Sequence, residues 1–304
     1  LLFAAITPAI IVGAFAERIK FAAVLVFMAI WFTINYVPMA HMGWGGGWVF
    51  QLGAQDFAGG NVVHVNVGIA ALVGAWLVGA RKGVGTASMA PHNMTMTMTG
   101  GSLLWVGWLA FCGGCVLAAN GFSMLVVLNT MLGAAAGTLS WMLVEWIHRG
   151  RPSMLGAVSG AIAGLVAITP ACGFVGPMGA IAIGLIVSPI CVWAVEKLKP
   201  MIGLDDSFDV FGVHGVGGIV GGILTTVFAM PALGGLGFAE GRDFGSQMQV
   251  QLLVIGFSVV YSAISSFIAF KAASLICGGL RVEEDDEVEG LDMSSHGEPG
   301  YKLS

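Results

Sequence analysis

The stretches that decide the fold are GGNVVHVNVGIAALVG at residues 59–74 and DVFGVHGVGGIVGG at residues 209–222. Aligned on their histidines, His64 and His214, both read V-H-x-x-x-G-I, and both lie within long apolar runs. A titratable side chain in hydrocarbon is costly, and it usually faces a bundle interior, a transport pathway or a proton relay. A matched pair therefore indicates a duplicated half-unit whose two copies meet at one site.

The composition is that of a polytopic α-helical membrane protein. Of the 304 residues, 57% are hydrophobic and 10% are charged, whereas ordinary soluble domains are about 25% charged. The 47 glycines fall mostly within apolar runs, where glycine lets helices approach closely in lipid. These unbroken runs exclude a β-barrel, whose strands alternate over about ten residues. The five cysteines also lie mostly in apolar runs, which argues against a disulfide framework.

Windows long enough to span a bilayer, about 20 residues each, divide most of the chain. They lie at 1–16, 21–40, 57–80, 94–118, 123–147, 153–171, 175–195, 208–230 and 248–277. The first window is short, and the chain opens within it at Leu1 without a basic segment, which is not typical of a signal peptide. We therefore expect that the beginning of the protein is missing.

Basic residues predict the orientation of these spans, because Lys and Arg concentrate in cytoplasmic loops. Alternate junctions carry pairs of them, namely Arg18 and Lys20, Arg81 and Lys82, Arg149 and Arg151, and Lys197 and Lys199. The junctions on the other side hold Arg242 alone. We expect the chain to begin outside and its acidic tail to lie inside. The helices of His64 and His214 then run in opposite directions, as in inverted-repeat transporters and channels.

Several longer motifs resemble the signatures of the ammonium transporter family, within the Amt/Rh superfamily. These are AHMGWGGG at 40–47, DFAGGNVVHVNVGIAALVGA at 56–75, PHNMTMTMTGGSLLWVGW at 91–108, LGAVSGAIAGLVAITPACGFVGPMGA at 155–180, DVFGVHGVGGIVGGILT at 209–225 and EGLDMSSHGE at 289–298. The first of them resembles the Amt branch more than the Rh branch. The resemblance covers essentially the whole chain.

The resemblance implies an all-α bundle with inverted-topology repeats, with about nine of eleven transmembrane helices present and the N-terminal ones absent. It implies a transmembrane domain over 1–280, incomplete at its N-terminus, and an acidic cytoplasmic tail over 281–304. Eight of the seventeen acidic residues lie between 283 and 298. A homotrimer and a PII-type signal protein at the tail are the partners that the family implies, although a charge run is usually only a solvated segment.

His64 and His214 match the twin pore histidines of the family. Two neutral imidazoles can share one N–H···N bond and still offer polar contact to a small uncharged solute. Phe3 and Phe111 match the stacked gate between the outer vestibule and the pore, although apolar character alone indicates core packing for both. Trp105 and Trp108 are read as packing or as secondary pore contacts.

Three further residues match the outer binding region of the family. Trp44 corresponds to the vestibule aromatic, whose face attracts cations, although an interfacial belt tryptophan is the plainer alternative. Cys115 stands where many bacterial relatives have serine, and a thiol is the weaker hydrogen-bonding group. Asp56 is either the acid that favours a cation there or a helix cap, and both roles are compatible. Asp209, five residues before His214, is interpreted as a cap or a repeat-related structural acid.

The leading hypothesis is ammonium transport: ammonium is recruited outside, loses its proton, and crosses as ammonia past the histidines. Methylammonium is a plausible second substrate, and no cofactor or nucleic acid is implied. The alternative is an ammonium sensor that signals through its tail, which a large extra cytoplasmic domain would favour. A membrane metalloenzyme is disfavoured, because metal sites usually need three or four ligands and no third ligand lies at that depth in these spans.

Overall fold

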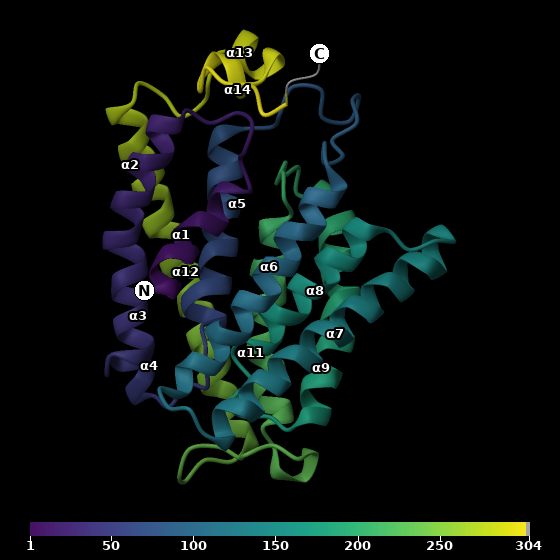
Figure 1. Cartoon of the computed structure of the whole chain (residues 1–304). Helices are drawn as coiled ribbons and strands as arrows, with labels where there is room; N and C mark the ends of the chain where they lie inside the picture. Colours follow the sequence, from purple (N-terminus) through teal and green to yellow (C-terminus); the bar gives the residue numbers. More distant parts are fainter. Residues whose placement is uncertain (302–304) are drawn as a thin grey trace.

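The computed structural model describes residues 1–301, and this range folds into a helical bundle with no β-strand (Figure 1). Positions 302–304, the end of the predicted tail, lie outside the described residues. Among the described residues, seven helical segments are long and apolar enough to cross a membrane, and Leu2–Val12 and Met154–Ile168 are shorter apolar helices. The seven are Phe21–Gln51, Gly60–Val78, Met94–Val116, Gly121–Arg149, Pro177–Met201, Phe211–Phe228 and Phe244–Ile276. Each predicted window therefore holds one apolar helix, and the all-helical membrane class is confirmed.

Several of these segments combine α-helical and π-helical turns. The α-helices are α1 (Leu2–Val12), α2 (Phe21–Trp31), α3 (Val37–Trp44), α4 (Trp48–Gln51), α5 (Asn66–Val78), α6 (Met94–Gly113), α7 (Gly121–Arg149), α8 (Met154–Ile168), α9 (Pro177–Trp193), α10 (Lys199–Met201), α11 (Gly217–Phe228), α12 (Phe244–Ile276), α13 (Glu284–Glu289) and α14 (Leu291–Ser294). The π-helical segments are η1 (Phe32–Tyr36), η2 (Gly60–Val65), η4 (Ala194–Leu198) and η5 (Phe211–Val216).

Polar side chains at the starts of the long helices explain why these helices begin where they do. The first turn of a helix leaves backbone N–H groups without partners, and short polar side chains accept from them. Asn120 and Asp243 each form a capping box with the serine three residues later, at the starts of α7 and α12. The side chains of Asn93 and Ser153 each accept from one backbone N–H at the starts of α6 and α8.

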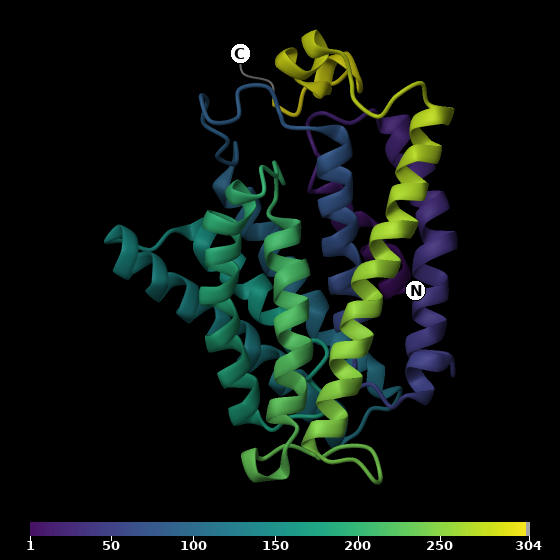
Figure 2. The same cartoon turned by 180° about the vertical axis from the view of Figure 1, so that it is seen from behind.

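The helices form two packed groups. One contains α1, α2, α5 and α12, and its buried apolar side chains include Phe27, Phe270 and, in the turn after α1, Phe15. The other contains α6, α7, α8, α9 and α11. Figure 2 shows α12 running beside α2 over the height of the bundle, with the other group to one side. The two groups meet where η2 and α5 cross η5 and α11.

The contacts of the loops define two ends of the bundle. At one, here the distal end, Gln55 donates to the carbonyl of Gly237 over 3.0 Å. At the other, the tail end, Arg81 pairs with Asp205, and α13 and α14 lie over the same end (Figure 1). The segment from η2 to α5 therefore starts at the distal end, while the segment from η5 to α11 starts at the tail end. The predicted antiparallel arrangement of the two histidine helices is confirmed by these contacts.

Candidate functional site

Both histidines lie in π-helical turns at the starts of their segments. His64 is in η2 and His214 is in η5, and each turn passes directly into an α-helix. Single π turns within α-helices often occur at functional sites, because the wider turn displaces the side chains that follow. The repeated motif therefore produces a repeated backbone feature, and both imidazoles are carried on it.

The glycine of the shared motif explains how closely the two helices approach. A Cβ atom at Gly68 would lie 2.2 Å from backbone atoms of Gly215, a separation that real side chains do not reach. A Cβ atom at the equivalent glycine, Gly218, would lie 3.0 Å from the backbone nitrogen of Val65 and 3.1 Å from the Cβ of His64. Only glycine permits helix backbones to meet at such distances. The motif V-H-x-x-x-G thus places each histidine one turn from the crossing point.

The two imidazoles form one hydrogen-bonded unit. The Nδ1 atoms of His64 and His214 are 3.2 Å apart, and their side chains are 0% and 9% exposed. A hydrogen bond between two Nδ1 atoms requires one ring to donate and the other to accept. In a neutral pair, the outward Nε2 atoms then differ, one carrying a proton and the other a lone pair. The Nε2 of His64 has no protein partner in the described structure, so it is free to contact a solute.

A line of aromatic rings leads from the histidines toward the distal half of the bundle. The rings of Phe3 and Phe111 are 3.8 Å apart between centroids, with an angle of 32° between their planes. Trp108 lies 5.5 Å from Phe111 and stacks on His64 at 5.0 Å and 17°. An apolar cavity of about 430 Å³ between α1 and α6 reaches Trp108, Phe111 and His64. The rings of Phe3 and Phe111 therefore contact each other near the imidazole pair, and their role as a gate stays a prediction.

Trp44 and Asp56 are joined through the backbone at the distal side of this line. The indole of Trp44 contacts Phe3 edge-on at 5.2 Å, and its Nε1 donates to the Asp56 carbonyl over 3.0 Å. The Asp56 carboxylate accepts from four consecutive backbone N–H groups, those of residues 59–62. Burial raises the pKa of Asp56, and these four bonds act in the opposite direction because they stabilise the carboxylate. The geometry is that of a cap, with the carboxylate turned into the helix start.

Cys115 lies one turn beyond Phe111 and is half-buried. Its thiol donates to the Phe111 carbonyl over 3.3 Å, so its hydrogen is directed along the helix. Thiols are weak hydrogen-bonding groups. The polar contribution of this position to a bound cation is therefore small.

The sequence analysis missed the acid that corresponds to Asp56 in the second repeat. Asp56 precedes His64 by eight residues, and Asp206 precedes His214 by the same interval, whereas Asp209 lies only five residues away. One oxygen of Asp206 accepts from the N–H of Phe211 over 2.7 Å, and the other has no protein partner in the described structure. Asp209 has a positive φ of 59° and pairs with Lys199. Counting back from each histidine would have identified Asp206.

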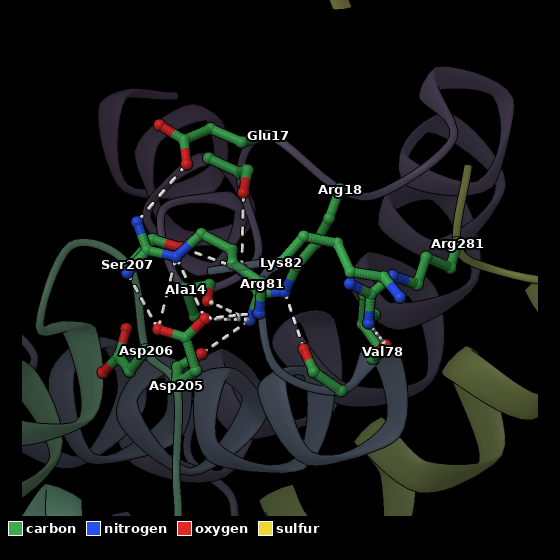
Figure 3. Close-up of polar contacts among 12 residues, drawn as sticks. Ala14, Glu17, Arg18, Val78, Arg81, Lys82, Asp205, Asp206, Ser207 and Arg281 are labelled. Atoms are coloured by element: carbon green, nitrogen blue, oxygen red, sulfur yellow. Dashed lines mark hydrogen bonds and ion pairs between the residues drawn. The ribbon is translucent and has the colours of Figure 1, made fainter. Parts of the chain in front are cut away.

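Four charged residues form a cluster at the tail end, namely Glu17, Arg18, Arg81 and Asp205 (Figure 3). The sequence indicated only Arg18 and Arg81, as markers of orientation. Arg18 is 0% exposed and donates to the carbonyls of Gly79 and Asp205 over 2.7 and 2.6 Å. Arg81 pairs with Asp205 at 2.8 Å and with Glu17 at 3.3 Å. Burial lowers the pKa of Arg18. Burial also acts to raise the pKa of Asp205, but the hydrogen bonds and charge of Arg81 outweigh it and hold that pKa below its usual range.

The tail is attached beside this cluster by hydrogen bonds and ion pairs. The backbone of Ile19 pairs with that of Arg281, and the Arg281 side chain binds Glu287 at 2.7 Å. Lys82 pairs with Glu284 at 2.8 Å. Within residues 1–301, no group of three or more His, Cys, Asp or Glu side chains is arranged to hold a metal ion.

Comparison with known proteins agrees with this architecture. The model of the Ammonium Transporter Family matches residues 1–301. The Ammonium transporter of Bacillus subtilis is 49% identical over 304 residues, which cover 99% of this chain and 74% of that protein. The crystal structure of Candida albicans Mep2 matches with a TM-score of 0.85 and 37% identity, over 94% of this chain and 65% of that one. A solved structure named Sensor Amt Protein matches with a TM-score of 0.88 and 30% identity, over 97% of this chain and 75% of that one.

Proposed function

The chain belongs to the ammonium transporter family, a family of transporters and not of enzymes, and on that premise we propose that it carries ammonium across a membrane as ammonia. The observation that carries the proposal is the buried imidazole pair at the crossing of the two inverted helices. An inverted repeat with its polar site at the crossing is an architecture of secondary transporters and channels.

The imidazole pair suits ammonia better than ammonium. The surroundings of His64 are aromatic and apolar, so a permanent charge there lacks a counter-ion among the described contacts. A neutral pair offers one N–H donor and one lone pair on its outward nitrogens, and ammonia both donates and accepts. Ammonia can therefore exchange hydrogen bonds along the pair without leaving a charge in the membrane.

The distal aromatic residues are the proposed entry. The indole face of Trp44 attracts a cation by about 0.5–2 kcal/mol, and the Phe3 and Phe111 rings separate that position from His64. Cys115 borders the same region with a weak polar group. Asp56 holds the entry loop through its four backbone hydrogen bonds and contributes negative charge from behind it. Ammonium would bind on the distal side of the phenylalanines and transfer its proton to water on that side, and ammonia would then pass them.

The tail end is proposed to face the cytoplasm, because the basic pairs Arg18/Lys20 and Arg81/Lys82 lie there. On this orientation the start of α1 belongs to the outer half, and residues 281–304 form a cytoplasmic tail after a transmembrane domain over 1–280. A homotrimer, and a PII-type signal protein at the tail, are proposed from the family. The carboxylates of Glu284 and Glu287 already occupy Lys82 and Arg281, so a partner at the tail would compete with these ion pairs.

A sensing role is the second candidate, and the match to Sensor Amt Protein favours it. A sensor needs to bind ammonium and to change the position of its tail, but it does not need to conduct. A transporter needs continuous flux across the membrane. Measured flux of ammonium across the membrane therefore separates the two candidates.

The proposed function is tested by His64→Ala and His214→Ala in the complete protein. Methylammonium uptake is measured in proteoliposomes, and the current carried by potassium is recorded separately as the test of selectivity. We expect each substitution to lower ammonia flux about tenfold or to admit potassium, because it removes one imidazole of the pair that contacts ammonia. A tenfold change corresponds to about 1.4 kcal/mol. His148→Ala, at the exposed end of α7, is the matched control and should behave as the wild type. Unchanged flux and selectivity in both pore variants would refute the proposal.

A further inference from the structure

The indole N–H of Trp108 has a single buried acceptor, the hydroxyl of Thr169. Trp108 is 4% exposed and Thr169 is 0% exposed. The Trp108 Nε1 lies 2.8 Å from the Thr169 Oγ1, and that oxygen donates in turn to the Leu165 carbonyl over 2.7 Å. With its own hydrogen directed to Leu165, the hydroxyl presents a lone pair to the indole. The hydrogen bond therefore has a defined direction.

This hydrogen bond fixes the ring that supports His64. A tryptophan side chain turns about two torsions, and packing alone leaves an indole free to tilt and slide over its neighbour. Trp108 is held at its edge by Thr169 and lies flat against the His64 imidazole, with an angle of 17° between the planes. The orientation of His64 relative to His214 therefore depends on the edge of Trp108 being held.

Thr169 also holds the entry loop, through its main chain. Its carbonyl accepts from the N–H of Ala58 over 3.2 Å, and the neighbouring carbonyl of Pro170 accepts from Phe57 over 3.1 Å. These residues directly follow Asp56, whose carboxylate starts the His64 helix. The residue at the end of α8 thus contacts both the loop before His64 and the ring beside it.

We propose that Thr169 is a positioning residue of the pore, which sets the orientation of His64 through the indole of Trp108 and keeps it in register with the entry loop. The inference rests on the proposed function, since orientation matters only if the imidazole pair conducts ammonia. No hydrogen bond joins Thr169 to His64 among the described residues, so the proposed action of Thr169 runs through Trp108 and the Ala58 loop.

The test compares Thr169→Val with Thr169→Ser by methylammonium uptake in proteoliposomes. Valine keeps the branched shape and the backbone contacts but removes the hydroxyl, so the Trp108 N–H loses its acceptor. We expect Thr169→Val to lower the maximal rate about tenfold with little change in the half-saturating concentration, because a misplaced His64 slows passage through the pore more than entry. Thr169→Ser should restore the rate. Thr225→Val is the matched control, because Thr225 is also 0% exposed and bonds only the carbonyl one turn back.

A double-mutant cycle with Trp108→Phe identifies the hydrogen bond as the cause. Phenylalanine keeps an aromatic ring but has no N–H, so Thr169→Val should have no further effect in that background. An equal loss in both backgrounds, or a wild-type rate for Thr169→Val, would overturn the positioning role. If Trp108→Phe is inactive, failure of Thr169→Ser to restore the rate overturns it instead. Loss in His64→Ala together with no loss in Thr169→Val leaves the proposed function standing and refutes this inference alone.

Discussion

The starts of the two histidine helices differ although their centres match. At the distal end, both oxygens of Asp56 are bound by backbone N–H groups. At the tail end, Asp206 occupies the same place in the repeat, but it has one backbone bond and one oxygen without a protein partner in the described structure. The distal loop is further held by the Trp44 indole, while the tail end is held by Arg18 and Arg81.

This difference separates the helix centres, which both copies share, from the two helix starts, which are each adapted to one end of the bundle. The crossing glycine, the π turn and the histidine recur in both copies, and the proposed function assigns them to the shared pore. The distal start combines aromatic rings with the backbone-bound carboxylate of Asp56, groups that suit capture of a small cation. The tail-end start is built from buried ion pairs next to the tail, which suit a mechanical connection between the pore helix and the tail.

The largest effect is expected from the element that the two copies share. Gly68→Ala places a Cβ 2.2 Å from the Gly215 backbone, and no flexible side chain can yield there. The helices have to separate, which we expect to cost at least about 3 kcal/mol. The measurement is the yield of monodisperse protein and its thermal midpoint in detergent. Gly256→Ala, on α12 with no atom within 4 Å of the new Cβ, should leave both unchanged; an equal loss there would assign the effect to helix glycines in general.

Removing the charge of Asp56 or Asp206 is expected to give the next largest change in thermal midpoint, and the two variants should differ. Asp56→Asn replaces one acceptor oxygen by an NH₂ group, so two backbone N–H groups lose their partner, at a cost of about 2 kcal/mol. Asp206→Asn can keep the bond to Phe211 and turns its amide nitrogen to the unpartnered side. We expect a lower thermal midpoint for the first variant only. Equal destabilisation by both would mean that the two starts are not different.

The pH dependence of the Asp206 variant sharpens the same comparison. Burial raises the pKa of Asp206 to about 6, above its value in the unfolded chain. The folded state therefore binds the proton more tightly, and the wild type loses stability as the pH rises from about 4 to about 6, by up to about 3 kcal/mol. Asp206→Asn lacks this loss. Its thermal midpoint should exceed that of the wild type at pH 8 and equal it at pH 4; a pH-independent difference would contradict the assignment.

Much of the fold was predictable because it depends on patterns that the bilayer imposes. Apolar length and basic pairs identified the spans and the opposed directions of the His64 and His214 helices. The family motifs indicated Phe3, Phe111 and Trp44, whose rings contact one another in the structure. The π turns were not predictable, because the apolar pattern that indicates a membrane helix does not specify where the helix widens. The Trp108–Thr169 bond was missed because its partners lie 61 residues apart with no shared motif.

The buried network at the tail end was missed for a different reason. Positive-inside counting treats Arg18 and Arg81 as loop charges exposed to water. Arg18 is instead 0% exposed, because it satisfies the carbonyls at the ends of two helices and the segment before η5. Only the folded arrangement brings residues 14–18, 79–81 and 205–207 together. The role of Asp206 was available from the repeat itself, and the closer Asp209 obscured it.

The smallest effect is expected at Cys115, where the distal entry has its weakest polar group. Cys115→Ser replaces a thiol that bonds the Phe111 carbonyl by a hydroxyl that can make the same bond and present a stronger acceptor to ammonium. We expect the half-saturating concentration for methylammonium to fall about threefold, less than 1 kcal/mol, with the maximal rate unchanged. Cys277→Ser, at the end of α12, is the matched control. If the distal start captures and the histidine pair conducts, as proposed, a change in the maximal rate without a change in affinity would place Cys115 in the conducting part instead.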